Sequence, residues 1–181
     1  MDYFKISLAG DLGSGKSTVT DILQKKFSAE IVSVGKIFRA SAAEMGMTPV
    51  QFNIFLEAHP EYDEKLDEKI HEYDSIVGNY IFDSRLAFHF VPSSFSYYLK
   101  VDVKEAAKRI MQAQRKDENY KTLDEAIEKL KERRESEKLR YKAFYHVDIT
   151  DMSNYDCVID TTDKTPEEVA ELIIKNYRQK F

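Results

Sequence analysis

The sequence of 181 residues is poor in the features that mark secreted, membrane and nucleic-acid-binding proteins. Its one cysteine, Cys157, excludes an internal disulfide, fits a reducing compartment and, in its apolar setting, predicts a buried thiol. There is no leader of basic and then apolar residues, and no apolar run nears the roughly 18 residues of a membrane span. Because 27 Lys and Arg face 32 Asp and Glu, no net basic charge favours a nucleic-acid backbone. We expect one cytoplasmic domain, monomeric or a weak homodimer, with no membrane or nucleic-acid partner.

One segment near the N-terminus contains most of the functional information. Residues 10–18 read GDLGSGKST, which matches the phosphate-binding pattern G-x-x-x-x-G-K-[ST]. An apolar run precedes it and apolar residues at helical spacing follow it, as this chemistry requires, because backbone N–H groups of the loop and of the helix start must face phosphate oxygens. We therefore predict a nucleoside triphosphate site made by Gly10, Asp11, Leu12, Gly13, Ser14, Gly15, Lys16, Ser17 and Thr18. Lys16 would act as a catalytic charge near the β and γ phosphates, and the Ser17 hydroxyl would bind Mg²⁺.

Short apolar runs alternate with helical stretches along the chain. They cover residues 3–9, 30–34, 79–82, 96–101 and 156–159. Strands that alternate with helices pair in parallel, so the order alone predicts an α/β fold of three layers, with the phosphate loop at the carboxyl end of the first strand. Capping signals at Thr48, Thr122 and Thr165 open further helices. We expect one domain, 1–181, with a helical insertion over about 36–76 and a polar lid over about 104–121.

Positive charges around the phosphate oxygens are the main requirement of phosphoryl transfer. Arg39 follows the second run, after a glycine turn at Gly35, and Arg85 lies just past the third run. Since parallel strand ends converge on the loop of the first strand, we predict that both guanidinium groups bind an acceptor phosphate; a solvated surface position is the alternative. Asp83 ends an apolar strand, where a carboxylate has no packing role, and is predicted to bind Mg²⁺ or orient the acceptor unless it caps a turn.

Further arginines lie in the expected lid and in the helix that follows it. One or two of them should contact the transferring phosphoryl group, and Arg115 and Arg134 are the best candidates for this catalytic role. The others, Arg109, Arg133 and Arg140, fit ordinary surface ion pairs at helical spacing. The four histidines have no metal-ligand spacing, and we assign them no chemistry.

The phosphate loop and several later segments together resemble the short, archaeal-type cytidylate kinases. These segments are residues 32–39 (VSVGKIFR), 45–48 (MGMT), 82–87 (FDSRLA), 145–149 (YHVDI) and 155–156. The resemblance implies a nucleoside monophosphate kinase with a five-stranded parallel sheet of order 2-3-1-4-5. It also implies the reaction of ATP with CMP, or with dCMP, assisted by Mg²⁺. In this family the residues that match Ser33, Gly35, Arg39 and Arg85 face the monophosphate.

The sequence departs from that family at a few positions. Asp11 and Leu12 stand where a proline pair is frequent, and Ser84 and His146 stand where glycine is usual. Ser84 fits only if its φ is negative or the turn has shifted. None of these changes removes a charge on which phosphoryl transfer depends.

Two alternatives stay open at this point. One is a kinase for another small acceptor, such as AMP, shikimate or dephospho-coenzyme A. The other is a GTP-dependent switch, but an Asn-Lys-x-Asp motif is absent and none of the six glycines follows an aspartate by three residues.

Overall fold

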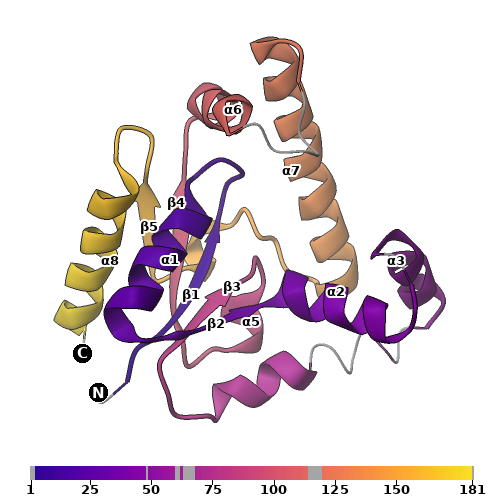
Figure 1. The fold of residues 1–181 in the computed structure, drawn as a ribbon, viewed down its shortest axis with the longest axis horizontal. Helices are drawn as coiled ribbons and strands as arrows, with labels where there is room; N and C mark the ends of the chain where they lie inside the picture. The colour runs from indigo at the N-terminus through magenta and orange to yellow at the C-terminus, as the bar shows by residue number, and fades with distance from the viewer. Residues whose placement is uncertain (1–2, 48, 60–61, 63–67, 114–119, 181) are drawn as a thin grey trace.

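A computed structural model of the chain describes residues 3–47, 49–59, 62, 68–113 and 120–180. All five predicted strands are present and form one parallel sheet (Figure 1). Their order is β2-β3-β1-β4-β5, which confirms the order 2-3-1-4-5. The strands are β1 (Lys5–Gly10), β2 (Glu30–Ser33), β3 (Tyr80–Asp83), β4 (Phe95–Lys100) and β5 (Cys157–Asp160).

The central strand β1 is buried along its whole length, as expected for a parallel strand with both faces covered. Its one charged member, Lys5, donates from Nζ to the carbonyl oxygens of Tyr73 and Asp74 at 3.0 and 3.1 Å and to Ser93 Oγ at 3.1 Å. Burial lowers the pKa of Lys5, although the charge of Asp74 opposes the shift. Lys5 therefore fastens the short helical segment at Tyr73 and Asp74, and the loop that contains Ser93, to the strand at the end away from the phosphate loop.

Helices cover both faces of the sheet and make the three predicted layers (Figure 1). Leu23 of α1 (Lys16–Phe27) and Ile173 of α8 (Pro166–Lys180) are fully buried with Ile6 and Ile81 of the sheet in one core. Phe82 points to the opposite face, where it packs with α5 (Ala87–Phe90). The segment that contains η2 (Met152–Asn154) packs on the same face.

The segment between β2 and β3 is largely helical. It contains α2 (Val34–Glu44), α3 (Pro49–Ala58), helical residues 68–71 and η1 (Glu72–Asp74). The predicted turn at Gly35 is wrong: Ser33 stays extended at φ −112° and ψ 114°, and α2 begins at the next residue, so Gly35 lies in the first helical turn. Thr48, the predicted cap of α3, lies outside the described residues.

Two helices follow β4 and pack against each other. They are α6 (Val103–Gln112) and α7 (Leu123–Tyr145), and Ala106, Ile110 and Leu130 are buried between them. Thr122 caps the N-terminus of α7, as predicted, because its Oγ1 accepts a hydrogen bond from the Glu125 N–H at 3.1 Å. The expected lid over 104–121 coincides with α6 in its first part, and residues 114–119 lie outside the described residues. No helix in the described ranges is long and apolar enough to cross a membrane.

The edge of the sheet corrects one prediction. Cys157 begins the edge strand β5 and is only partly buried, so it is not the core thiol that its apolar neighbours indicate. Asn176 donates to its Sγ at 3.3 Å. Burial raises the pKa of the thiol, and the Asn176 contact opposes this shift.

Ser84 and His146, the two residues that stand where the family usually has glycine, differ in backbone conformation. Ser84 does not adopt a positive φ, as predicted, and its Oγ accepts from the Leu86 N–H at 3.2 Å. His146 ends α7 in the left-handed region, at φ 57° and ψ 23°. This is the conformation that favours glycine after a helix, since a side chain there crowds the backbone.

Replacing His146 with glycine should therefore stabilise the fold. We expect the free energy of unfolding to rise by about 1 kcal/mol, because glycine has no Cβ to strain a left-handed residue. Urea unfolding of His146→Gly measures this. His89→Gly, within the helix α5, is the matched control and should lower stability instead. An unchanged or lower midpoint for His146→Gly would contradict the assignment of strain to this residue.

Candidate active site

The loop between β1 and α1 wraps around the start of the helix. Gly13 and Gly15 both have positive φ, 79° and 81°. A Cβ on Gly13 would lie 2.8 Å from the carbonyl oxygen of Ala106, so a side chain cannot fit there. Gly15 caps α1 without any side-chain hydrogen bond, which leaves the first N–H groups of the helix available to an anion. In the same loop Ser14 is buried, while Ser17 and Thr18 are exposed.

Three of the predicted residues meet where neighbouring strands end. Lys16 forms an ion pair with the Asp83 carboxylate, and both side chains are about a quarter exposed. Asp83 is the last residue of β3 and lies in register with Leu8 of β1 and Ser33 of β2. A lysine, a carboxylate and a serine are thus placed together beside the phosphate loop.

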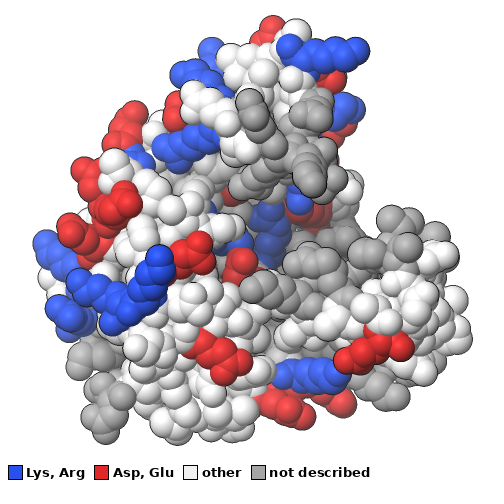
Figure 2. All heavy atoms as spheres, viewed as in Figure 1, with Lys and Arg blue, Asp and Glu red and all other residues white. Residues whose placement is uncertain are grey.

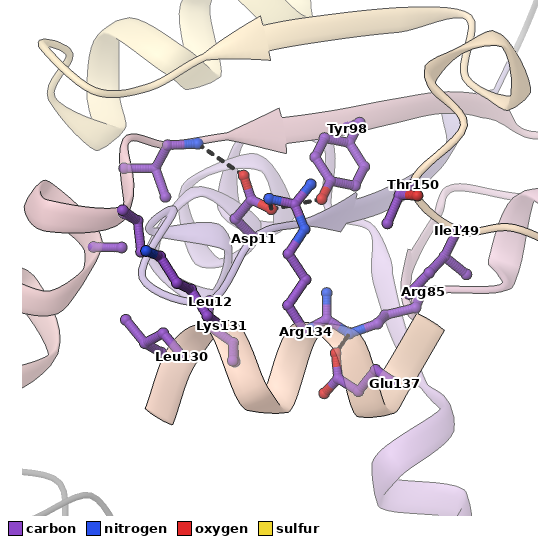
Figure 3. A pocket seen from close by; sticks show the side chains of 13 residues that line it. Asp11, Leu12, Arg85, Tyr98, Leu130, Lys131, Arg134, Glu137, Ile149 and Thr150 are labelled. Atoms are coloured by element: carbon purple, nitrogen blue, oxygen red, sulfur yellow. Dashed lines mark hydrogen bonds and ion pairs between the residues drawn. The ribbon is translucent and has the colours of Figure 1, made fainter. Parts of the chain in front are cut away.

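The guanidinium group of Arg85 lies against the same loop. Its Nη1 donates to the Gly10 carbonyl oxygen at 2.5 Å, and its Nε is 2.6 Å from Oε2 of Glu137 on α7. On α7, one turn before Glu137, Arg134 reaches Asp11 of the loop, with Nη1 3.3 Å from Oδ1. Two ion pairs therefore join the core to α7 (Figure 3). The core contributes the arginine to one pair, Arg85–Glu137, and α7 contributes it to the other, Arg134–Asp11.

Besides its ion pair with Arg134, the Asp11 carboxylate accepts two hydrogen bonds. The Tyr98 hydroxyl donates to Oδ1 at 2.6 Å, and the Val101 N–H donates to Oδ2 at 3.1 Å. Burial raises the pKa of Tyr98, and the hydrogen bond to Asp11 adds to the shift, so the hydroxyl stays a proton donor. Tyr98 is buried in the core, and its hydroxyl also fixes the second residue of the phosphate loop.

A cavity of about 250 Å³ opens between the loop and α7. Figure 3 shows the Arg85 and Arg134 side chains reaching into it from the core and from α7. Figure 2 shows a hollow in the same view as Figure 1, between α7 and the α2–α3 region, with basic and acidic atoms inside it. The cavity is lined by Asp11, Leu12, Arg85, Tyr98, Val101, Val103, Ala106, Leu130, Lys131, Arg134, Glu137, Ile149 and Thr150.

Comparison with known proteins assigns this arrangement to a family. The model of the cytidylate kinase-like family matches residues 5–163, which include the phosphate loop, Asp83, Arg85 and α7. The chain belongs to the cytidylate kinase-like family.

Relatives in this family are similar over most of the chain. A cytidylate kinase of Halorubrum lacusprofundi is 36% identical over 171 residues, which are 93% of this chain and 86% of that protein. A cytidylate kinase of Methanobrevibacter smithii is 33% identical over 93% of this chain and 95% of its own. An S-adenosylmethionine-dependent nucleotide dehydratase of Lacinutrix mariniflava is 40% identical over 97% of this chain, but the chain spans only 36% of that protein's length.

Solved structures agree with the fold. A shikimate kinase from Bacteroides thetaiotaomicron superimposes with a TM-score of 0.65 over 97% of this chain and 98% of its own, at 15% identity. An uncharacterised protein from Eubacterium ventriosum gives a TM-score of 0.72 over 96% and 97%, also at 15% identity. At this identity the likeness shows the fold alone, and that fold is the one predicted for the cytidylate kinase-like family.

The remaining predicted arginines of this family member differ in their surroundings. Arg109 donates from Nη2 to the carbonyl oxygens of Thr161 and Thr162 at 2.9 and 2.8 Å, so it ties α6 to the loop after β5. Arg133 pairs with Glu137 at helical spacing, with Nε 3.3 Å from Oε1. Arg115 lies outside the described residues, as do the side chains of Arg39 and Arg140.

Sequence reasoning missed Glu137 and the partners of Asp11. Glu137 lies in a charge-dense helix, where an acidic residue four positions after Arg133 fits a solvated pair. Tyr98 and Asp11 are 87 residues apart, and only the pairing of β1 with β4 brings them together. Spacing patterns within a single helix or strand therefore could not predict either contact.

The donor set fits Mg²⁺ delivered with a nucleotide. Among the described residues, no group of three or more His, Cys, Asp or Glu side chains surrounds a metal position. The exposed Ser17 hydroxyl and the Asp83 carboxylate, which is in contact with Lys16, supply oxygen atoms next to the loop. Mg²⁺ commonly binds in this way, through one or two protein oxygens together with phosphates and water.

Proposed function

We propose that this protein transfers the γ-phosphoryl group of ATP to CMP or dCMP, giving ADP and CDP or dCDP. The observation that supports this most is the pair of guanidinium groups, Arg85 and Arg134, that face one cavity beside the phosphate loop from two different elements. A triphosphate site alone needs the loop and Lys16. Additional cations across a cavity favour a second phosphate, that of an acceptor.

In the proposed reaction the donor phosphates lie on the loop. The N–H groups of the loop and those at the start of α1 would donate hydrogen bonds to the phosphate oxygens. Lys16 would leave Asp83 and contact the β and γ phosphates. Mg²⁺, held through Ser17 and Asp83, would neutralise charge on the same oxygens. Asp83 and Lys16, paired in this structure, would thus separate to serve the metal and the phosphates.

The acceptor is proposed to lie across the cavity from the donor. Arg85, with Arg39, would bind its phosphate. Ser33 and Asp83 would face it from the strand ends, and Gly35 from the first turn of α2. An oxygen of that phosphate attacks the γ phosphorus in line as the bond to the bridging oxygen breaks, and ADP departs with the electron pair. Arg134 and Arg115 would stabilise charge on the equatorial oxygens. We also propose that residues 36–76 and about 104–121 close over the two substrates, which excludes water.

A nucleotide acceptor is favoured over shikimate or dephospho-coenzyme A by the relatives at substantial identity. Two of them are named cytidylate kinases, and the third is named for a reaction on a nucleotide. The shikimate kinases share the fold at low identity only and do not indicate the acceptor. We propose a protein that acts as a monomer or a weak homodimer.

An acceptor panel tests this proposal. ADP release from MgATP would be measured with CMP, dCMP, UMP, AMP, GMP and shikimate, each over a range of concentrations. We expect CMP and dCMP to give the highest kcat/KM. AMP phosphorylated much faster than CMP would overturn the cytidylate assignment, and turnover of shikimate alone would overturn a nucleotide acceptor altogether.

A further inference from the structure

The described contacts of Arg85 use only part of its guanidinium group. Nε forms an ion pair with Glu137 Oε2 at 2.6 Å, and Nη1 donates one hydrogen to the Gly10 carbonyl oxygen at 2.5 Å. A guanidinium group has five N–H donors in a fixed plane, so further N–H groups remain on the two terminal nitrogens. A planar group with such donors can bind a phosphate bidentately.

Glu137 is well placed to fix this orientation. Its side chain is 16% exposed and that of Arg85 19%, so the pair is partly shielded from solvent and stronger than a surface pair. Its second oxygen, Oε1, lies 3.3 Å from Nε of Arg133, one helical turn earlier. Two guanidinium groups thus lie beside one carboxylate, that of Glu137.

We propose that Glu137 is a positioning residue for the acceptor phosphate: it holds Arg85 by its Nε edge and so presents the terminal nitrogens to the substrate. The inference rests on the proposed role of Arg85 in binding the acceptor. Glu137 need not touch either substrate. Because Glu137 belongs to α7 and Arg85 follows β3, the same contact also joins α7 to the strand ends.

The substitution Glu137→Gln tests the proposal with little change of shape. The amide removes the charge that holds Nε, so Arg85 samples other orientations. We expect the KM for CMP to rise about tenfold, an effect between those of a surface ion pair and a buried one, because the Arg85–Glu137 pair is partly shielded. The KM for ATP should stay within about twofold, because the loop and Lys16 do not contact Glu137.

The double variant Arg85→Ala, Glu137→Gln separates positioning from a general structural role. If Glu137 acts through Arg85, the double variant has the same acceptor KM as Arg85→Ala alone. The matched control is Glu132→Gln on the exposed side of α7, where Glu132 pairs with Lys129 at 2.7 Å; its constants should equal those of the unaltered protein. If Glu137→Gln does not fold, Glu137→Asp serves instead. The shorter side chain keeps the negative charge but moves it away from Arg85 by one methylene, and we expect the acceptor KM to rise as well.

The outcomes are distinguishable. An unchanged acceptor KM for Glu137→Gln, equal rises of the KM values for ATP and CMP, or an added effect in the double variant would overturn the positioning role. If Arg85→Ala alone leaves the acceptor KM unchanged, the proposed role of Arg85 fails first, and the inference about Glu137 fails with it.

Discussion

Replacing Lys16 with alanine is expected to reduce kcat by about 10²- to 10³-fold, the range seen when one group that stabilises transition-state charge is removed. Lys16 begins α1 directly after the loop, and in this structure its ammonium group is paired with Asp83. No other lysine lines the loop itself at residues 10–18, so no second ammonium group replaces it there. Steady-state rates of ADP release at saturating ATP and CMP measure the loss.

The control for this prediction lies on the same helix. Lys25, in the last turn of α1, is exposed and far along the helix from the loop. Lys25→Ala should leave kcat and both KM values unchanged. Lys16→Ala with more than half of the original kcat would mean that the loop does not bind a transferring phosphate in the proposed way.

Replacing Arg85 with alanine is expected to raise the KM for the acceptor about 30- to 100-fold, because a paired, partly buried charge facing a phosphate contributes at the upper end of charge-assisted contacts. The ATP KM should change little, since the donor is held by the loop and Lys16. The variant also leaves Glu137 without its closest cation, although Arg133 still lies 3.3 Å from Oε1. Initial rates over a matrix of ATP and CMP concentrations separate the two constants.

Arg178, exposed on α8, provides the matched control for Arg85. Arg178→Ala removes a guanidinium group of the same kind away from the cavity and should leave both KM values as they are. If Arg85→Ala instead raises the ATP KM and leaves that of CMP unchanged, Arg85 belongs to the donor half of the site.

Local patterns in the sequence predicted the architecture well. The phosphate loop lies between β1 and α1, and the alternation of apolar runs with capped helices places each strand within one or two residues of its observed bounds. These features depend on residues that are close in the chain. Asp83 and Arg85 were also predicted to lie beside the loop, because the rule that parallel strand ends converge needs only the order of the strands.

The parts that the sequence did not predict depend on contacts between distant residues. Asp11 is fixed by Tyr98 and Val101, and Glu137 engages Arg85; these pairs are 52 to 90 residues apart in the chain. Gly35 was predicted in a turn because glycine often ends an element, yet the chain passes from strand to helix without one. Local spacing shows which residues can do chemistry, and tertiary pairing decides which of them face each other.

The central claim is that a phosphoryl group moves from ATP to cytidylate at this site. The most direct measurement mixes the protein with Mg²⁺, CMP and ATP labelled in its γ phosphate, and then separates the products. The account predicts that the label appears in CDP in step with the ADP formed, and that Lys16→Ala slows this transfer by about 10²- to 10³-fold. Label that appears only in inorganic phosphate, or ATP that stays intact while CMP is present, would contradict it.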